Sequence, residues 1–238
     1  MKIAHRLSFH FDQNKLLKEL KLAKQEWTLH FNTHYFGGEW SGIVLRAHNT
    51  SIEGIATGQG DASSYQDTPT LKKLHYIQEI LDYFQCPITS VRLLKLTPGS
   101  VIKEHTDPDL VFWEGLVRLH IPIITNDQVR FIVDGEDLMM LPGECWFAEF
   151  CQPHSVENKG ETDRIHLVID LETNDWLKAL FEKEGIVSAN ESKPDPIDSF
   201  SLEQKLEMIR SFKQMGTPDT LEMANEMIRK YGIESPLE

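Results

Sequence analysis

The sequence has few cysteines and no long apolar segment, and these absences exclude several classes of protein. Its cysteines, Cys86, Cys145 and Cys151, form no Cys-x-x-Cys pair, so neither a disulfide framework nor a zinc knuckle is expected. No stretch approaches ~18 consecutive apolar residues, and charge interrupts the first apolar run too early for a signal peptide. We therefore expect a cytoplasmic protein with reduced thiols and no membrane partner.

Positive charge is also scarce. The chain has 24 Lys and Arg residues against 37 Asp and Glu residues, a formal net charge of −13. An acidic surface of this kind repels phosphate backbones and anionic lipid headgroups, so no nucleic acid partner is expected. The sequence also lacks a Gly-x-Ser-x-Gly motif, a phosphate loop and a dinucleotide fingerprint, which disfavours a serine hydrolase, a kinase or a nicotinamide enzyme.

The length and composition suit one large globular domain with a small appendage. The chain has 238 residues, of which 40% are hydrophobic, enough to bury a sizeable core. In the first part, Asp12 is placed to cap a helix, and Thr68-Pro69 to open a second helix that runs through Phe84. Residues 37–66 are rich in Gly, Ser and Asn, which predicts short strands and loops.

A polar, proline-containing linker over 188–200 divides the chain into an expected main domain, 1–187, and a C-terminal helical appendage, 188–238. Ser201 begins a capping box and Gly216 marks the end of the helix that follows it. Thr217-Pro218 then opens a second helix. This hairpin is too short to bury a core alone, so we expect it to pack on the main domain or to support a homodimer.

Between 91 and 171 at least six closely spaced apolar runs predict strands. Asp134-Gly135 separates two of them and predicts a hairpin, because both central residues of a type I′ turn need positive φ. So many short strands imply an antiparallel sandwich or barrel. The expected fold class is mainly β with flanking helices, built on a double-stranded β-helix of the jelly-roll or cupin kind.

Three residues in this β region could hold a metal ion. His105 and Asp107 are separated by one residue, so on an extended strand their side chains point to the same side. His154 follows after enough strands for the chain to return to the same end of a barrel. Two imidazoles and one carboxylate suit non-haem Fe(II) that binds a chelating cosubstrate and O₂. Taken singly, these residues fit ordinary polar turns equally well.

Arg164 decides between these interpretations. It begins an apolar strand, and alternation places it on one face with His166 and Val168. If that face lines the barrel, its guanidinium can bind the distal carboxylate of 2-oxoglutarate with two hydrogen bonds. If the face is external, Arg164 is a surface residue paired with nearby acids, and His166 has no assigned catalytic role in either case.

Together these segments resemble the aspartyl/asparaginyl β-hydroxylase family of Fe(II)/2-oxoglutarate dioxygenases, and most of all its small bacterial members, which include cis-selective proline hydroxylases. The resemblance is carried by VRLLKLTPGSVIKEHTDPD, VRLHIPIITN, FIVDGE, LPGECWF, PHSVENKGETDRIHLVIDL and NDW, within 91–176. It implies that His105, Asp107 and His154 are the iron ligands and that Arg164 binds the cosubstrate. The carboxylate that membrane-anchored animal members lack is present here as Asp107.

The resemblance also implies that Arg118 and His120, in an Arg-x-His-x-Pro strand, face the cosubstrate or the carboxylate of the substrate. Strand alternation puts both on one face. Arg92 and Trp40 are weaker candidates for substrate contacts, since a surface cation and a core aromatic explain them better. Glu114 is a further weak candidate, in a segment after the metal motif that could act as a lid.

The expected function is therefore Fe(II)- and 2-oxoglutarate-dependent hydroxylation of a C–H bond, with O₂ as the second cosubstrate. Arginines in an otherwise acidic protein suit a small substrate that carries a carboxylate, and we expect a free amino acid such as proline. Two alternatives stay open: hydroxylation of an aspartyl or asparaginyl side chain in a peptide, and a non-catalytic cupin-like module that binds a metal or a small acid.

Overall fold

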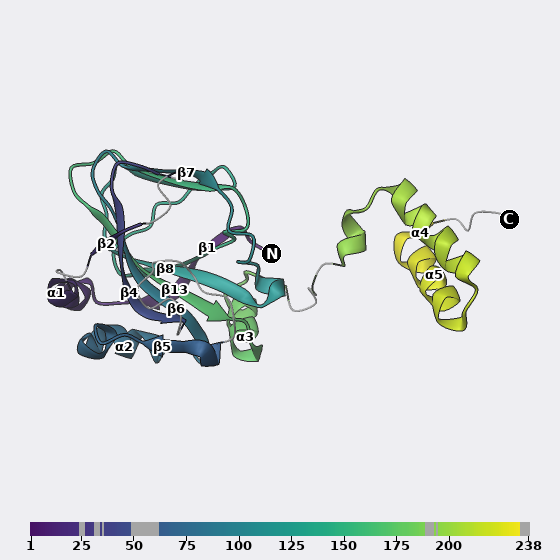
Figure 1. Ribbon diagram of the computed structural model, residues 1–238, viewed down its shortest axis with the longest axis horizontal. Helices are drawn as coiled ribbons and strands as arrows, with labels where there is room; N and C mark the ends of the chain where they lie inside the picture. Colours follow the sequence, from purple (N-terminus) through teal and green to yellow (C-terminus); the bar gives the residue numbers. More distant parts are fainter. Residues whose placement is uncertain are drawn as a thin grey trace. The chain divides into compact units, whose positions relative to one another are not determined.

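The computed structural model describes residues 1–23, 27–30, 34, 36–48, 62–188, 193 and 195–233. The chain divides into two compact units, Met1–Glu191 and Ser192–Glu238 (Figure 1). The boundary predicted from the sequence lay between 187 and 188. Among the described residues, no helix is both long and apolar enough to cross a membrane.

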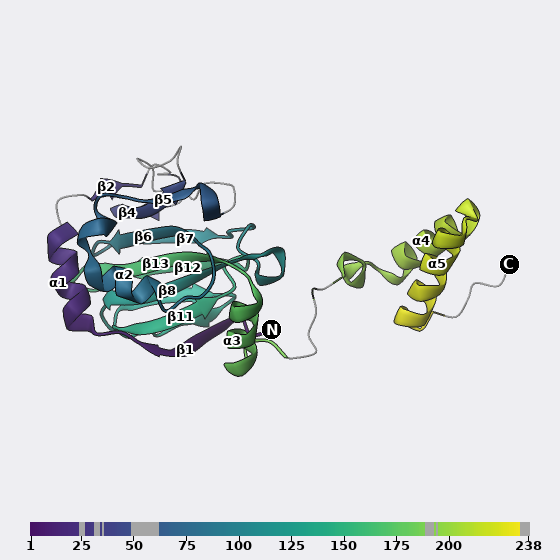
Figure 2. The same ribbon diagram turned by 90° about the horizontal axis from the view of Figure 1, so that it is seen from below.

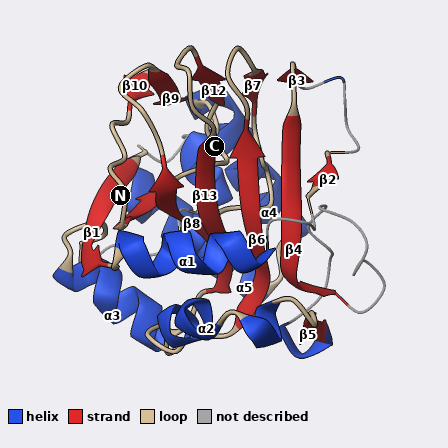
Figure 3. Cartoon of the chain, turned by 90° about the vertical axis from the view of Figure 1, so that its left-hand side faces the viewer, coloured by secondary structure: helices blue, strands red, loops and turns tan. Residues whose placement is uncertain are grey.

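The first unit contains two antiparallel sheets. The larger one has the strand order β1 (Ala4–His10), β11 (Glu144–Ala148), β8 (Leu116–Ile124), β13 (Arg164–Glu172), β6 (Ile88–Leu96), β4 (Trp40–His48) and β2 (Thr28–Leu29), with β5 (Tyr65–Asp67) on β4. The smaller one has the order β10 (Glu136–Asp137), β9 (Val129–Val133), β12 (His154–Asn158), β7 (Val101–His105) and β3 (Phe36–Gly37). Figure 3 shows β13, β6 and β4 side by side in the larger sheet.

The path of the chain between the two sheets identifies the fold. Successive strands from β6 to β13 alternate between the larger and the smaller sheet. The one exception is the β9–β10 hairpin, both strands of which belong to the smaller sheet. This alternation is that of a jelly roll, so the predicted double-stranded β-helix is confirmed. The predicted turn is also present, because Asp134 and Gly135 have φ of 48° and 79° and join β9 to β10.

Helices cover the face of the larger sheet that points away from the smaller sheet (Figures 1 and 2). They are α1 (Gln13–Ala23), α2 (His75–Leu81) and α3 (Asp175–Lys183). The predicted cap of α1 is confirmed, because the Asp12 carboxylate accepts hydrogen bonds from the backbone of Asn14 and Lys15. The apolar core fills the space between these helices and the sheet, and includes Leu16, Ile77, Leu93, Leu119, Leu167 and Phe181.

The helix predicted from Thr68-Pro69 through Phe84 is interrupted. A 3₁₀ turn, η3 (Leu71–Lys73), comes first, and α2 begins only after Leu74, whose φ and ψ are −103° and 79°. The Thr68 hydroxyl lies within hydrogen-bonding distance of the backbone carbonyls of Val44 and Leu45. The segment is thereby tied to β4 by a tertiary contact, which overrides the helical spacing of its apolar residues.

The second unit is a helical hairpin. It contains η5 (Pro196–Ser199), α4 (Leu202–Met215) and α5 (Pro218–Tyr231). Capping boxes at Ser201 and Thr217 begin the two helices, and Gly216 and Gly232 end them at φ of 68° and 59°. The predicted starts of both helices and the predicted end of the first are therefore observed. The small apolar core of this unit consists of Ile209, Ala224, Met227 and Ile233.

A buried asparagine fixes the point at which β13 begins. The Asn158 amide, with 0% exposure, donates to the backbone carbonyls of Leu96 and Thr162 and accepts from the backbone of Gly160. It thus joins the end of β6 to the turn between β12 and β13. Because Arg164 is the first residue of β13, this turn determines where that side chain enters the barrel.

We expect Asn158→Asp to lower the free energy of unfolding by about 2–4 kcal/mol, because a carboxylate would face two carbonyl oxygens and lose both donated bonds. Urea unfolding followed by circular dichroism measures the change. Gln128→Glu, an exposed amide-to-acid change, is the matched control and should stay within about 0.5 kcal/mol of the parent protein. Equal stability of the Asn158→Asp variant would mean that this amide does not hold the turn.

Candidate active site

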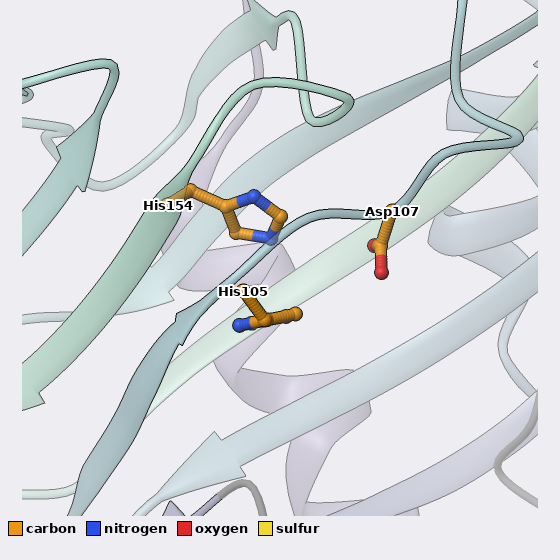
Figure 4. A group of neighbouring side chains, drawn as sticks. All are labelled: His105, Asp107 and His154. Carbon is orange, nitrogen blue, oxygen red and sulfur yellow. The ribbon is translucent and has the colours of Figure 1, made fainter.

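Two neighbouring strands of the smaller sheet bring His105, Asp107 and His154 together. His105 ends β7, His154 begins β12, and the antiparallel register places them directly opposite each other. Asp107 follows β7, and its backbone N–H donates to the carbonyl of Phe150 at 2.9 Å. One ligand atom from each of the three side chains lies within 4.8 Å of the others, and Figure 4 shows the side chains gathered around a shared space.

A backbone carbonyl fixes the orientation of each imidazole. Nδ1 of His105 lies 2.8 Å from the carbonyl of Lys103, and Nδ1 of His154 lies 3.0 Å from that of Gln152. A carbonyl only accepts, so each Nδ1 must carry the proton. In the neutral ring this leaves the lone pair on Nε2, which is the arrangement in which histidine binds a metal ion.

Charge at this cluster also suits a cation. Burial alone would raise the pKa of Asp107, but the Arg118 guanidinium and the two histidines lower it, so the carboxylate is ionised at neutral pH. Burial lowers the pKa of His154, and the positive charges of His105 and Arg118 add to this effect, while the Gln152 carbonyl and Asp107 oppose it. His154 is therefore neutral at pH 7, and Asp107 and His154 have the protonation states of metal ligands.

Arg164 lies inside the barrel, as the functional interpretation of its strand required. Its side chain is 2% exposed, and its Nη2 donates to Nδ1 of His166 at 2.8 Å. Burial lowers the pKa of Arg164 to about 9, so it is still charged at pH 7. Within the described part of the chain, no carboxylate pairs with Arg164 and its Nε has no hydrogen-bond partner. Such a buried cation is costly unless an anion binds to it.

His120 also faces the interior of the barrel. Its Nδ1 lies 3.2 Å from Nδ1 of His166, and its ring is close to those of Phe131 and Phe150. Burial, together with the nearby arginines, holds the pKa of His120 well below its usual value, and the ring is neutral. Arg164, His166 and His120 thus form one buried, hydrogen-bonded group.

Arg118 lies between two carboxylates. Its Nη1 donates to Oδ2 of Asp107 at 2.5 Å, and its Nε and Nη2 donate to the two oxygens of Asp170 at 2.6 and 3.0 Å. Arg92 reaches the same Asp170 carboxylate at 2.8 Å. The sequence analysis did not single out Asp170, although it shares the inner face of β13 with Arg164. We call Arg92, Asp170, Arg118 and Asp107 the arginine–aspartate chain.

The remaining candidates have different surroundings. Trp40, at the start of β4, packs on Leu94 and Val168 and stacks on His30 with ring centroids 3.7 Å apart. His30 was missed in the sequence, because it adjoins a strand of two residues. Glu114 is exposed in the 3₁₀ turn η4 (Phe112–Glu114), whereas the other candidates face the interior.

Residues 11–174, more than half of the chain, match the family model described as aspartyl/asparaginyl beta-hydroxylase. The chain belongs to this family. The resemblance inferred from the motifs is therefore confirmed. Family membership implies Fe(II) as the metal, with 2-oxoglutarate and O₂ as cosubstrates.

An L-proline cis-4-hydroxylase of Rhizobium meliloti (strain 1021) is 29% identical over 174 residues, which cover 70% of this chain and 61% of that protein. Among solved structures, a 2OG-Fe(II) oxygenase family oxidoreductase from Burkholderia pseudomallei is 14% identical with a TM-score of 0.49, covering 72% of this chain and 86% of that one. A Pseudomonas putida prolyl-4-hydroxylase is 16% identical with a TM-score of 0.42, covering 72% and 93%. These two structural similarities carry no argument about the substrate.

Proposed function

We propose that this member of the aspartyl/asparaginyl β-hydroxylase family is an Fe(II)- and 2-oxoglutarate-dependent dioxygenase that hydroxylates a free amino acid such as proline. The observation that carries the proposal is the buried guanidinium of Arg164, which no carboxylate of the described residues pairs with, in the same barrel as the His105–Asp107–His154 cluster. A metal-binding module without a cosubstrate would have no need of this cation.

The donors fit the two groups that the family implies. His105, Asp107 and His154 would hold iron from one side, which leaves coordination positions open for ligands. Arg164 would bind the distal carboxylate of 2-oxoglutarate, and the buried ring of His120 would line the same space. When bound, iron and 2-oxoglutarate activate O₂, with release of succinate and CO₂, and oxidise a C–H bond of the substrate.

The charges inside the barrel support a substrate that carries a carboxylate. Around the metal cluster, the three guanidinium groups of Arg92, Arg118 and Arg164 outnumber the carboxylates of the arginine–aspartate chain, Asp107 and Asp170, by one charge. Fe(II) adds two positive charges and 2-oxoglutarate two negative ones, so one positive charge remains for the carboxylate of a substrate. A carboxylate would lie near Arg92 and Arg118, with Trp40 as an apolar wall.

The similarity to an L-proline cis-4-hydroxylase supports a free amino acid over a peptide side chain. The role of Glu114, a cytoplasmic location and a dimeric state stay predictions from the sequence.

The test begins with the purified protein, kept anaerobic with Fe(II). We expect a visible charge-transfer absorption when 2-oxoglutarate is added, and its absence would favour the non-catalytic module. Succinate release is then measured in air with a panel of free amino acids and with short peptides that contain Asp or Asn. Release that depends on proline supports the proposal, whereas release that depends on the peptides alone would assign the side-chain hydroxylase.

A further inference from the structure

The arginine–aspartate chain connects the interior of the larger sheet to one of the three clustered residues. Arg118 lies on β8, Asp170 on β13, and the two residues are directly opposite each other in the antiparallel register. Their contact is bidentate, with Nε on one carboxylate oxygen and Nη2 on the other. Two parallel charge-assisted bonds fix the plane of a guanidinium as well as its position.

The third donor of this guanidinium is directed at Asp107. Nη1 of Arg118 binds Oδ2 of that carboxylate, which leaves Oδ1 as the oxygen directed to a cation as far as the described residues show. Asp107 needs such support, because it follows the end of β7 and lies outside any strand. Without it, the carboxylate could rotate and present either oxygen, or both, to a cation.

Arg118 cannot supply this orientation by itself. Its side chain is long and has many rotamers, so its far end is placed only if something else holds it. Asp170 is 1% exposed and lies within a central strand, and its backbone carbonyl accepts the hydroxyl of Thr89 on β6. It is therefore the rigid member of the group, although it lies two contacts away from the metal cluster.

We propose that Asp170 is a positioning residue of the metal site: it holds Arg118 so that Asp107 presents one oxygen to the ion. The inference rests on the proposed function, in which the ion is iron. Arg92 binds the same Asp170 carboxylate from β6 and provides the comparison, since removing it leaves the contacts from Asp170 through Arg118 to Asp107 in place.

The test measures binding of Mn(II), a redox-stable substitute for Fe(II), to the metal-free protein by calorimetry. Residues that orient metal ligands through hydrogen bonds typically contribute about 10–100-fold to metal affinity. Asp170→Asn should therefore weaken Mn(II) binding by about that factor. Arg92→Gln should stay within about threefold of the parent protein, because it spares the connection to Asp107. The rise in thermal midpoint that Mn(II) produces gives a second readout, and it should shrink in Asp170→Asn alone.

The possible results distinguish failure of the positioning role of Asp170 from failure of the proposed function. Unchanged Mn(II) affinity in Asp170→Asn would overturn the inference, and so would equal weakening in both variants, which would indicate a general effect on the barrel. Failure of the parent protein to bind Mn(II) would instead overturn the proposed function.

Asp170→Asn leaves two buried arginines with one carboxylate fewer and could prevent folding. The double variant Asp170→Asn/Arg92→Gln preserves the net charge of the interior and still removes the support of Arg118. It should show the same 10–100-fold loss of Mn(II) affinity. Parent-like affinity in the double variant would count against the inference.

Discussion

Replacing His154 with alanine is expected to reduce succinate formation to below about 0.1% of the parent activity, because the metal ion supplies the reactive chemistry and this histidine is one of its proposed ligands. His154 is the most buried of the three clustered residues, and its Nδ1 is held by the carbonyl of Gln152, so its Nε2 is directed by the fold. Truncation removes this donor, and no other histidine takes its register position opposite His105.

The measurement is succinate release at saturating Fe(II) and 2-oxoglutarate, together with Mn(II) affinity by calorimetry. His75→Ala removes an exposed histidine at the start of α2 and should keep parent activity. Circular dichroism confirms that both variants are folded. Retention of more than about a tenth of the activity in His154→Ala would contradict its assignment as a metal ligand.

Replacing Arg164 with alanine is expected to raise the KM for 2-oxoglutarate by about 100-fold or more, equivalent to about 2.7 kcal/mol. A buried guanidinium that binds a carboxylate through two charge-assisted bonds loses at least this much when it is removed. The KM of Arg164→Lys should lie between those of the parent protein and Arg164→Ala, because lysine keeps the charge but cannot make two parallel hydrogen bonds.

The KM for 2-oxoglutarate is obtained from succinate release, and the rise in thermal midpoint on adding 2-oxoglutarate reports binding without turnover. Arg130→Ala is the matched control, because Arg130 is an exposed arginine paired with Asp137. An unchanged KM in Arg164→Ala would show that another arginine binds the cosubstrate. The anion that binds the buried Arg164 would then be a molecule other than 2-oxoglutarate.

Local patterns in the sequence predicted most of the fold. Asp134-Gly135 identified a hairpin because positive φ is a property of those two residues themselves, and Ser201 and Asp12 identified helix starts for a similarly local reason. The alternation of β13 put Arg164 and His166 on one face without any knowledge of the neighbouring strands. Burial of Arg164 then showed that this face is the inner one.

Contacts between distant strands could not be predicted in the same way. Asp170 meets Arg118 because β13 and β8 pair in one register, and a bulge between Ile165 and His166 shifts that register. The sequence placed Arg118 toward a ligand, but it did not predict that Nε, Nη1 and Nη2 of Arg118 bind Asp107 and Asp170. Likewise, the helix expected from Thr68 to Phe84 breaks because of a hydrogen-bonding contact with β4 that local spacing does not report.

The two faces of β13 have different surroundings. Arg164, His166 and Asp170 alternate with Leu167 and Ile169, which pack beneath the helices. Substitutions of Leu167 or Ile169 would therefore disturb the packing against the helices, whereas substitutions on the other face would change the charged and polar groups inside the barrel. A single-residue insertion or deletion in β13 would exchange the two sets of side chains, so the strand should not tolerate a change in length.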